Sequence, residues 1–290
     1  MTPDTLAQPA LWPLSLLVFL PALVAAVLSL PIIPKAREEM IRWITLATTA
    51  VVFVISLWMA WPTLFGSVGP AQFVVGEAGM QAVVQRPWIP AFGIEYLLGV
   101  DGISMPLVVL TTFLSMLAAA ASWPITKHVK AYHVLFLLLE TGMLGVFVSL
   151  DFFLFYVFWE VMLLPMYFLI GIWGGPRREY AAIKFFLYTL LGSVLMLIAV
   201  LMLYFTSDLR MLSPEQLAAA HATIPASAAA DQPVHTFNLL ALAELGQLPN
   251  SPFAAVQLWG MSLETWAFLL LLIGFVIKVP VVPVHTWLPD

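Results

Sequence analysis

Four charged side chains of this sequence fall inside long apolar segments, where such groups are rare. They are Glu140, Glu160, Lys184 and Lys278. An ionised and unpaired side chain at the centre of a bilayer costs roughly 3 kcal/mol or more, so these residues by default mark a pathway for ions or protons. Carboxyl and amino groups exchange protons readily, and proton transfer is therefore the chemistry that these residue types predict.

The two glutamates flank the segment Ser149-Leu-Asp151, which is too short for anything but the turn of an antiparallel helix pair. Each glutamate lies about ten residues from that turn, hence about 15 Å deep. Two carboxyls close together in a low dielectric cannot both ionise easily, so we expect one to hold or share a proton. Two alternatives stay open: a protonated acid that only hydrogen-bonds a neighbouring helix, and helix faces that diverge.

Lys278 precedes Pro280, Pro283 and His285. Each proline removes a backbone donor and clashes with the preceding turn, so we expect the helix to break just after Lys278. Broken helices at membrane depth recur at transporter binding sites. His285 would lie two turns along the same face if helical geometry survived the break. The alternatives are a lysine that snorkels to the interface and a histidine with a structural hydrogen bond.

Lys184 lies one turn into an apolar segment that begins near Tyr180. Snorkelling to the nearby membrane surface would explain this lysine equally well. Tyr188, one turn deeper, would continue a polar stripe and keeps Lys184 among the proton-relay candidates. His133 lies near the end of another apolar segment, and we expect it to be interfacial.

The composition requires a membrane, because 62% of the residues are hydrophobic and only 9% are charged. Seven segments reach the length of about 20 apolar residues that a spanning helix needs. They are 11–30, 41–62, 103–123, 131–150, 152–173, 180–206 and 263–285. The sequence therefore predicts an all-α, polytopic membrane helix bundle of about seven transmembrane helices, the seventh broken by proline.

Lysine and arginine collect in alternate loops, as expected for cytoplasmic loops. The loops after the first, third and fifth segments hold Lys35, Arg37 and Arg42; Lys127 and Lys130; Arg177 and Arg178. The other side holds only Arg86 and Arg210. This pattern places the N-terminus outside, and the lack of basic residues ahead of the first apolar segment favours a retained span over a signal peptide.

Two long loops, 63–102 and 207–262, lie on the predicted outer side. The first contains a weak hairpin signal, with 72–75 and 81–84 as its strands. The second contains two short-helix signals, one starting at Ser213-Pro-Glu-Gln216 and one over 236–245, which we expect to lie on the surface. A disordered linker is an equal alternative for 222–234.

Several function classes are excluded or disfavoured by composition. The sequence has no cysteine, so it offers no disulfide, no thiolate metal site and no iron–sulfur ligation. The net charge of −5 is spread over the loops without a basic patch, which argues against nucleic acid as a partner. We expect no metal and no cofactor on this chain.

Four segments together resemble a known family. They are Gly99-Val-Asp101-Gly-Ile-Ser104, residues 150–170 around Phe158-Trp159-Glu160, Lys184-Phe-Phe-Leu-Tyr188, and Lys278-Val-Pro-Val-Val-Pro-Val-His285-Thr-Trp-Leu-Pro-Asp290. The sequence resembles the antiporter-like chain M of proton-pumping NADH:quinone oxidoreductase, respiratory complex I, which is chain 4 in mitochondria and plastids. The match runs from about residue 85 onward.

The resemblance implies roles for particular residues. Glu160 and Lys278 match a coupled charge pair in the family's proton channel, and Lys184 and His285 match further relay positions. Glu140 is less firmly part of that pattern, so its role rests on the hairpin argument above.

The resemblance also implies an organisation. We expect 1–130 to form an N-terminal three-helix segment with outer loop 63–102. We expect 131–290 to form an incomplete first antiporter-like repeat with outer loop 207–262. The family fold has two inverted repeats, so the sequence, which stops at Asp290, is expected to be the N-terminal half of that fold and a fragment.

The function implied is that of a proton-translocating membrane subunit, an enzyme subunit only in that sense. NAD, FMN, iron–sulfur clusters and quinone would be in partner subunits. Its partners would be other membrane subunits of complex I and the lipid bilayer, and its location the bacterial inner membrane. The alternatives are a subunit of a multi-subunit Na⁺/H⁺ antiporter, which shares this ancestry, and a non-conducting structural membrane subunit.

Overall fold

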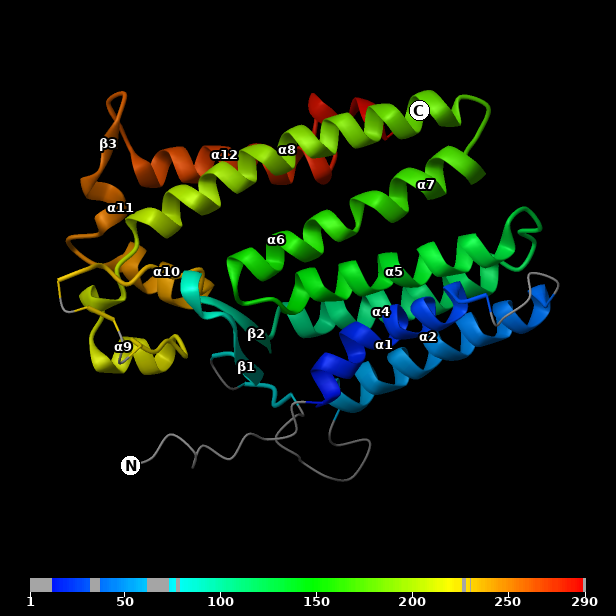
Figure 1. Ribbon diagram of the computed structural model, residues 1–290, viewed down its shortest axis with the longest axis horizontal. Helices are drawn as coiled ribbons and strands as arrows, with labels where there is room; N and C mark the ends of the chain where they lie inside the picture. The colour runs from blue at the N-terminus through cyan, green and yellow to red at the C-terminus, as the bar shows by residue number, and fades with distance from the viewer. Residues whose placement is uncertain are drawn as a thin grey trace. The chain divides into compact units, whose positions relative to one another are not determined.

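The computed structural model of the chain describes residues 12–31, 37–61, 73–76, 79–225, 228–229 and 231–288. The chain forms two compact units. The first unit comprises Met1–Val84, Leu98–Ser149 and Val157–Gly175, and the second comprises Gln85–Leu97, Leu150–Tyr156 and Pro176–Asp290. Nearly all the regular structure in both is helical (Figure 1).

Long apolar helices build the first unit (Figure 1, blue to green). They are α1 (Trp12–Ser29), α2 (Glu38–Ala60), α4 (Ser104–Ala121), α5 (Val129–Val148), the end of α6 (Phe152–Val161) and α7 (Leu163–Trp173). The α1 helix packs on α5, and α2 packs on α4. A buried hydrogen bond of 2.8 Å between the hydroxyls of Ser56 and Thr112 joins α2 to α4.

Two glycines let α5 approach the end of α6 closely. A Cβ atom at Gly142 would overlap the side chain of Met162, and one at Gly145 would overlap the ring of Phe158. Small residues at such positions allow membrane helices to pack backbone against side chain. The contact therefore fixes which faces of the two helices meet.

The second unit is built on α8 (Arg178–Thr206) and α12 (Leu263–Lys278), which pack along each other. A Cβ atom at Gly274 would come within 2.9 Å of the carbonyl oxygen of Gly192, so the two helices cross at a pair of glycines. Ser262 caps the start of α12 by accepting a hydrogen bond from the amide of Thr265. Shorter elements complete this unit: η3 (Leu209–Met211), α9 (Pro214–Ala219), α10 (Leu239–Gln247), α11 (Pro252–Ala255), η4 (Val284–Trp287) and the antiparallel pair β3 (Gln257–Leu258) and β4 (Met261–Ser262).

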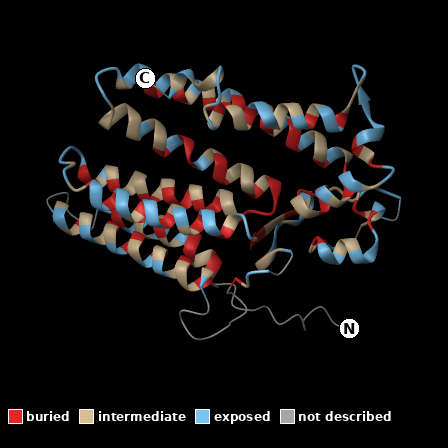
Figure 2. Cartoon of the chain, turned by 180° about the vertical axis from the view of Figure 1, so that it is seen from behind, coloured by how far each residue is buried: buried red, intermediate tan, exposed pale blue. Residues whose placement is uncertain are grey.

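Five of the described helical segments are long and apolar enough to cross a membrane, rather than the seven expected. They are α2, α4, α5, α6 with α7, and α8. The first and seventh predicted spans correspond to α1 and α12, but α12 has only 16 residues because it ends at Lys278. Burial alternates along the long helices, as amphipathic packing requires (Figure 2). The chain is a polytopic helical membrane bundle.

The fifth predicted span is interrupted at Met162, where α6 gives way to α7. Pro165 explains the interruption, because it has no N–H to donate to the carbonyl of Val161, the last residue of α6. The segment remains 22 residues long overall, from Phe152 to Trp173.

The predicted outer hairpin has the wrong partner strand. Residues 81–84 do lie in a strand, β1 (Gln81–Ile89), but it pairs with β2 (Ile94–Val100) across η2 (Pro90–Phe92). Val74 instead exchanges hydrogen bonds with the side-chain amide of Gln81, at 2.7 and 2.9 Å. A side-chain amide thus takes the place of a backbone ladder. Gln72 lies outside the described residues.

Both short helices predicted within 207–262 exist. The sequence predicted a helix start at Ser213-Pro-Glu-Gln216, and there Ser213 caps α9 in a capping box with Gln216. The second helix, α10, covers most of 236–245, but it does not simply lie on the surface, because Ala241, Leu242 and Leu245 are buried.

Candidate functional site

Glu140 lies on the buried face of α5, with 0% of its surface exposed. Neither carboxyl oxygen has a hydrogen-bond partner among the described residues. The buried hydroxyl of Ser115 on α4 faces this carboxyl without reaching hydrogen-bond geometry. A group of this kind binds a proton or a polar ligand more readily than it bears a bare charge.

Glu160 lies near the end of α6, and its buried Oε1 atom has no described hydrogen-bond partner. Phe158 and Met162 are the residues that α6 and the following turn present to α5. Glu160 is two residues from each, about 200° around the helix, and therefore points away from α5.

The two acids consequently do not face each other. Glu140 is likewise two residues from Gly142, which contacts Met162, so its side chain leaves the opposite side of α5. The tight turn predicted between α5 and α6 is confirmed, and of the alternatives that the sequence left open the structure favours diverging helix faces, which leaves no shared proton between Glu140 and Glu160. The glycine contact decides this, because it turns both acids outward from the hairpin.

Lys278 is half-buried and is the last residue of α12, so the helix breaks where the prolines predicted. The freed backbone groups find partners beyond the break. The indole N–H of Trp287 donates to the carbonyl of Ile277 at 2.8 Å, and the amide of Val281 donates to Val276 at 3.1 Å.

Lys184 on α8 is bound by the segment that follows the break. Its Nζ donates to the backbone carbonyl of Thr286 at 2.5 Å and lies 5.7 Å from the ring centroid of Tyr180. The hydroxyl of Thr286 donates to that of Tyr188 at 3.2 Å. Lys184 and Tyr188 therefore both hydrogen-bond to Thr286. The polar stripe that the sequence suggested continues into the segment after the break.

His285 lies in η4, and its Nδ1 atom is buried without a described hydrogen-bond partner. Residues 279–283 separate η4 from α12 and are not helical. The two-turn alignment of His285 with Lys278 required an unbroken helix, so that alignment does not hold. The histidine still lies beside Thr286, which binds Lys184.

His133 is the residue that sequence reasoning missed. We expected it at the interface, but only 1% of its surface is exposed and neither ring nitrogen has a described partner. The i, i+7 spacing from Glu140 places both residues on one face of α5 and was the available signal. Arg42 of α2 acts electrostatically on His133 and donates to the carbonyl of Ile125 at 2.9 Å.

A partnered acid pair lies outside the spanning segments, in the second unit. Asp151 is fully buried, and its carboxyl accepts the amides of Glu95 at 3.0 Å and Leu154 at 2.9 Å, which caps α6. Burial raises the pKa of Asp151, which these hydrogen bonds only partly offset. Burial also raises the pKa of Glu95, against the hydrogen bonds from Gln85 and together with the charge of Asp151.

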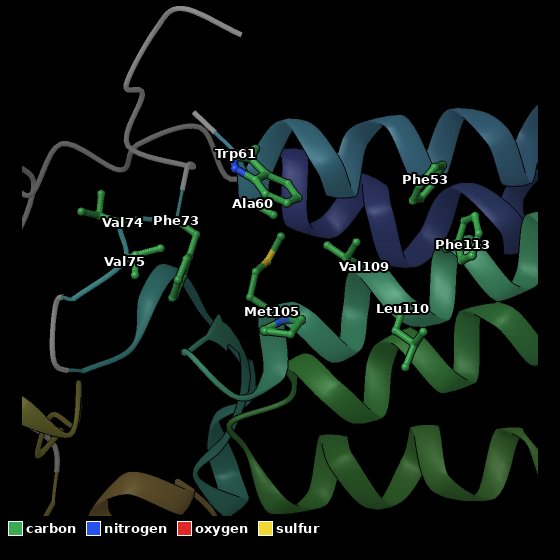
Figure 3. Close-up of a pocket in the computed structure, with 11 residues that line it drawn as sticks. Phe53, Ala60, Trp61, Phe73, Val74, Val75, Met105, Val109, Leu110 and Phe113 are labelled. Carbon is green, nitrogen blue, oxygen red and sulfur yellow. The ribbon is translucent and has the colours of Figure 1, made fainter. Parts of the chain in front are cut away.

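An apolar cleft of about 830 Å³ opens in the first unit between α2 and α4 (Figure 3). None of the described residues that line it carries a carboxyl, an amine or an imidazole. Its lining residues are Phe53, Ala60, Trp61, Phe73, Val74, Val75, Met105, Pro106, Val109, Leu110 and Phe113. Nor do three His, Cys, Asp or Glu side chains gather as metal ligands would anywhere in the part of the chain that the structure describes.

Two family models match the chain. Residues 17–150 match "NADH-ubiquinone oxidoreductase chain 4, amino terminus", and residues 149–290 match "NADH:quinone oxidoreductase/Mrp antiporter, TM". The chain is 39% identical over 283 residues to NADH-quinone oxidoreductase subunit M of Rhodobacter capsulatus, covering 96% of this chain and 47% of that protein. It is 36% identical to NAD(P)H-quinone oxidoreductase chain 4 of Gloeobacter violaceus, covering 96% of this chain and 43% of that protein.

Solved structures agree with these matches. Respiratory complex I from Thermus thermophilus with bound NADH contains a chain with a TM-score of 0.67 and 26% identity, covering 95% of this chain and 46% of that one. A chain of the Mrp complex from Dietzia sp. shares the fold, with a TM-score of 0.62 and 18% identity, covering 96% and 25%. The chain thus spans about half the length of the curated relatives it matches. It belongs to the antiporter-like chain M, or chain 4, family of NADH:quinone oxidoreductase subunits.

Proposed function

We propose that this chain is a proton-translocating membrane subunit of an NADH:quinone oxidoreductase, moving protons across the membrane as other subunits pass electrons from NADH to quinone. Family membership supports the proposal. The observation that carries it is the helix break directly after Lys278, with a second lysine, Lys184, bound to the backbone beyond that break. Discontinuous helices with exposed carbonyls are how membrane proteins hold cations at depth.

The proposed mechanism couples Glu160 to Lys278. When Lys278 is protonated and Glu160 is ionised, each charge stabilises the other. A disturbance of this pair releases the lysine proton, which Lys184 and His285 relay. The pairing rests on the resemblance to the family, and Glu160 and Lys278 belong to different units of the fold. In this mechanism the proton moves between a carboxyl oxygen of Glu160, the Nζ atoms of Lys278 and Lys184 and a ring nitrogen of His285, and electron transfer takes place in partner subunits.

NAD, FMN, iron–sulfur clusters and quinone would be bound by partner subunits, and the immediate partners would be antiporter-like membrane subunits. The distribution of lysine and arginine favours an N-terminus outside the bacterial inner membrane. The loops that carry Lys127, Lys130, Arg177 and Arg178 would then face the cytoplasm.

Replacement of the central acid tests the proposal. In the complete complex, Glu160→Gln should abolish coupled proton pumping while assembly and NADH oxidation continue. Glu95→Gln, an acid outside the spanning segments, is the matched control and should pump normally. Full pumping by Glu160→Gln would contradict the mechanism, and failure of the complex to assemble would favour a structural subunit instead.

A subunit of a multi-subunit Na⁺/H⁺ antiporter is the second candidate. The family model that matches residues 149–290 covers both protein classes by its own description. Purification of the chain from its membrane distinguishes them. Co-purification with flavin and iron–sulfur subunits supports the oxidoreductase, whereas sodium-dependent proton transport without them supports the antiporter.

A further inference from the structure

The buried face of α5 in the first unit carries two titratable groups that the Glu160–Lys278 mechanism does not use. Glu140 and His133 are 0% and 1% exposed. Four of their polar side-chain atoms, two on each residue, have no hydrogen-bond partner among the described residues. Buried polar atoms are almost always hydrogen-bonded, so an orphaned acid and an orphaned imidazole on one helix face require an explanation.

Among the described residues, α1, α4 and α7, which pack on α5, contain no charged side chain that could neutralise Glu140. The α2 helix carries its charges, Glu38, Glu39 and Arg42, in its first turns. Glu160 points away, as described above. An ionised carboxylate at the position of Glu140 would cost about 3 kcal/mol or more, so Glu140 holds a proton.

His133 occupies a different position on the same face. It lies two turns, about 10 Å, from Glu140 toward the start of α5. That end of the unit holds Arg42 and Lys130, and its aromatic contacts between Trp43 and Trp123 are typical of a membrane interface. An imidazole accepts a proton on one ring nitrogen and releases one from the other, which suits an entry position.

A dry layer separates the two groups. Leu137 lies between them on α5 and packs with Ala25, Leu28 and Ile41 in a fully buried apolar cluster. Apolar constrictions of this kind gate pores by excluding water until they are opened. Proton passage from the histidine to the acid thus requires water to enter this layer.

We propose that Glu140 and His133 form a second proton-binding site inside the first unit, distinct from Glu160 and loaded from the end that carries Arg42 and Lys130. The ligand is the proton. Glu140 stores it as a neutral carboxylic acid and gives it up to a water molecule of the pumping route, which leaves a carboxylate. A proton that His133 accepts on one ring nitrogen and releases from the other then restores the acid through water that enters the Leu137 layer. The site deepens the proposed function by adding an entry branch, and it rests on that function for its role in pumping.

Infrared difference spectroscopy of the complete complex in vesicles tests the storage step without reference to pumping. The wild type should show a carboxylic acid C=O band that Glu140→Gln removes and Glu160→Gln leaves in place. Persistence of the band in Glu140→Gln overturns the proposal. Full pumping by Glu160→Gln would overturn only the Glu160 mechanism, so the two failures are distinguishable.

Proton-uptake kinetics test the branch. His133→Asn and Glu140→Gln should each slow uptake by about a hundredfold, the usual contribution of one acid–base group. The double variant should be no slower than either single one, because both act in one route. Effects that multiply, or unchanged uptake in either single variant, overturn the proposal.

Two further variants distinguish a specific loss of proton uptake from a general loss of folding. Glu140→Asp keeps an acid in place and should retain both the band and fast uptake. Thr112→Val removes the bond to Ser56 in the same bundle and should lower stability without slowing uptake. If Thr112→Val slows uptake as much as Glu140→Gln does, general destabilisation explains the result and the proposal fails.

Discussion

The two units accommodate an ionisable group within a long apolar helix in opposite ways. In the first unit, Glu140 lies on an unbroken helix among apolar side chains and has no described hydrogen-bond partner. In the second unit, Lys184 binds a carbonyl of the segment that follows the break in α12. An acid becomes neutral by gaining a proton and can then tolerate a continuous helix, whereas a protonated amine needs oxygen atoms that an intact helix keeps for itself.

Making α12 continuous past Lys278 should have the largest effect on this difference between the two units. Each proline in a helix interior costs about 3 kcal/mol, so Pro280→Ala with Pro283→Ala should let α12 continue past Lys278. The carbonyl of Thr286 would then bond within its own helix and lose Lys184. We expect pumping to stop. Hydrogen exchange at residues 279–285 should report new protection, and unchanged protection would show that tertiary contacts, rather than the prolines, maintain the break.

A charge reversal at Glu140 is the next largest test. Glu140→Lys would place an ammonium on the unbroken helix without an available carbonyl and should destabilise the first unit by about 3 kcal/mol. Glu140→Gln, which resembles the protonated acid, should change stability by no more than about 0.5 kcal/mol. Thermal unfolding of the detergent-solubilised complex measures both. Equal losses in the two variants would mean that Glu140 is ionised in the folded protein.

A smaller effect is expected from Tyr188, whose hydroxyl binds the segment that holds Lys184. Tyr188→Phe removes the hydroxyl that accepts from Thr286 and should cost about 1 kcal/mol. It should also weaken the hold of the 284–287 segment on Lys184, visible as faster hydrogen exchange there. Tyr180→Phe keeps a ring beside Lys184 and is the matched control. Identical exchange in both variants would remove Tyr188 from the stripe.

The smallest effect concerns the acids outside the membrane. Burial raises the pKa of Asp151 and Glu95 in the folded protein above their ordinary values of 3.8 and 4.5. As pH rises, both carboxyls therefore ionise at a lower pH in the unfolded chain than in the folded protein. The free energy of unfolding should fall as the pH rises from these ordinary values to the raised pKa of each group. Asp151→Asn should flatten this part of the stability–pH curve, while a curve that rises through the same window would contradict it.

Much of the architecture was predictable because it follows from local chemistry. Pro280 ends α12 where its missing N–H requires, and Ser213 with Gln216 starts α9 as a capping box. The hairpin partner was not predictable, because Gln81 uses its side chain to bind Val74. The short connection between α5 and α6 was also evident from Ser149 to Asp151.

The site was less predictable than the fold. Residue types and spacing identified Glu140, Glu160 and Lys184, but spacing along the chain does not say which way a side chain leaves its helix. Gly142 sets that direction by admitting Met162, and its role depends on a contact between two helices. His133 was missed because proximity to a helix end was taken to mean exposure, whereas α1 and α2 cover that end of α5.

The glycine crossing of α8 and α12 has a consequence for insulation. Lys184 lies about two turns before Gly192, and Lys278 about one turn after Gly274. Because the two helices run in opposite directions (Figure 1), both lysines lie on the same side of the crossing. A Cβ atom on Gly274 would lie only 2.9 Å from the carbonyl oxygen of Gly192, so no water molecule fits between the two backbones at that point. The crossing therefore closes the seam between α8 and α12 at one point, with both lysines on the same side of it.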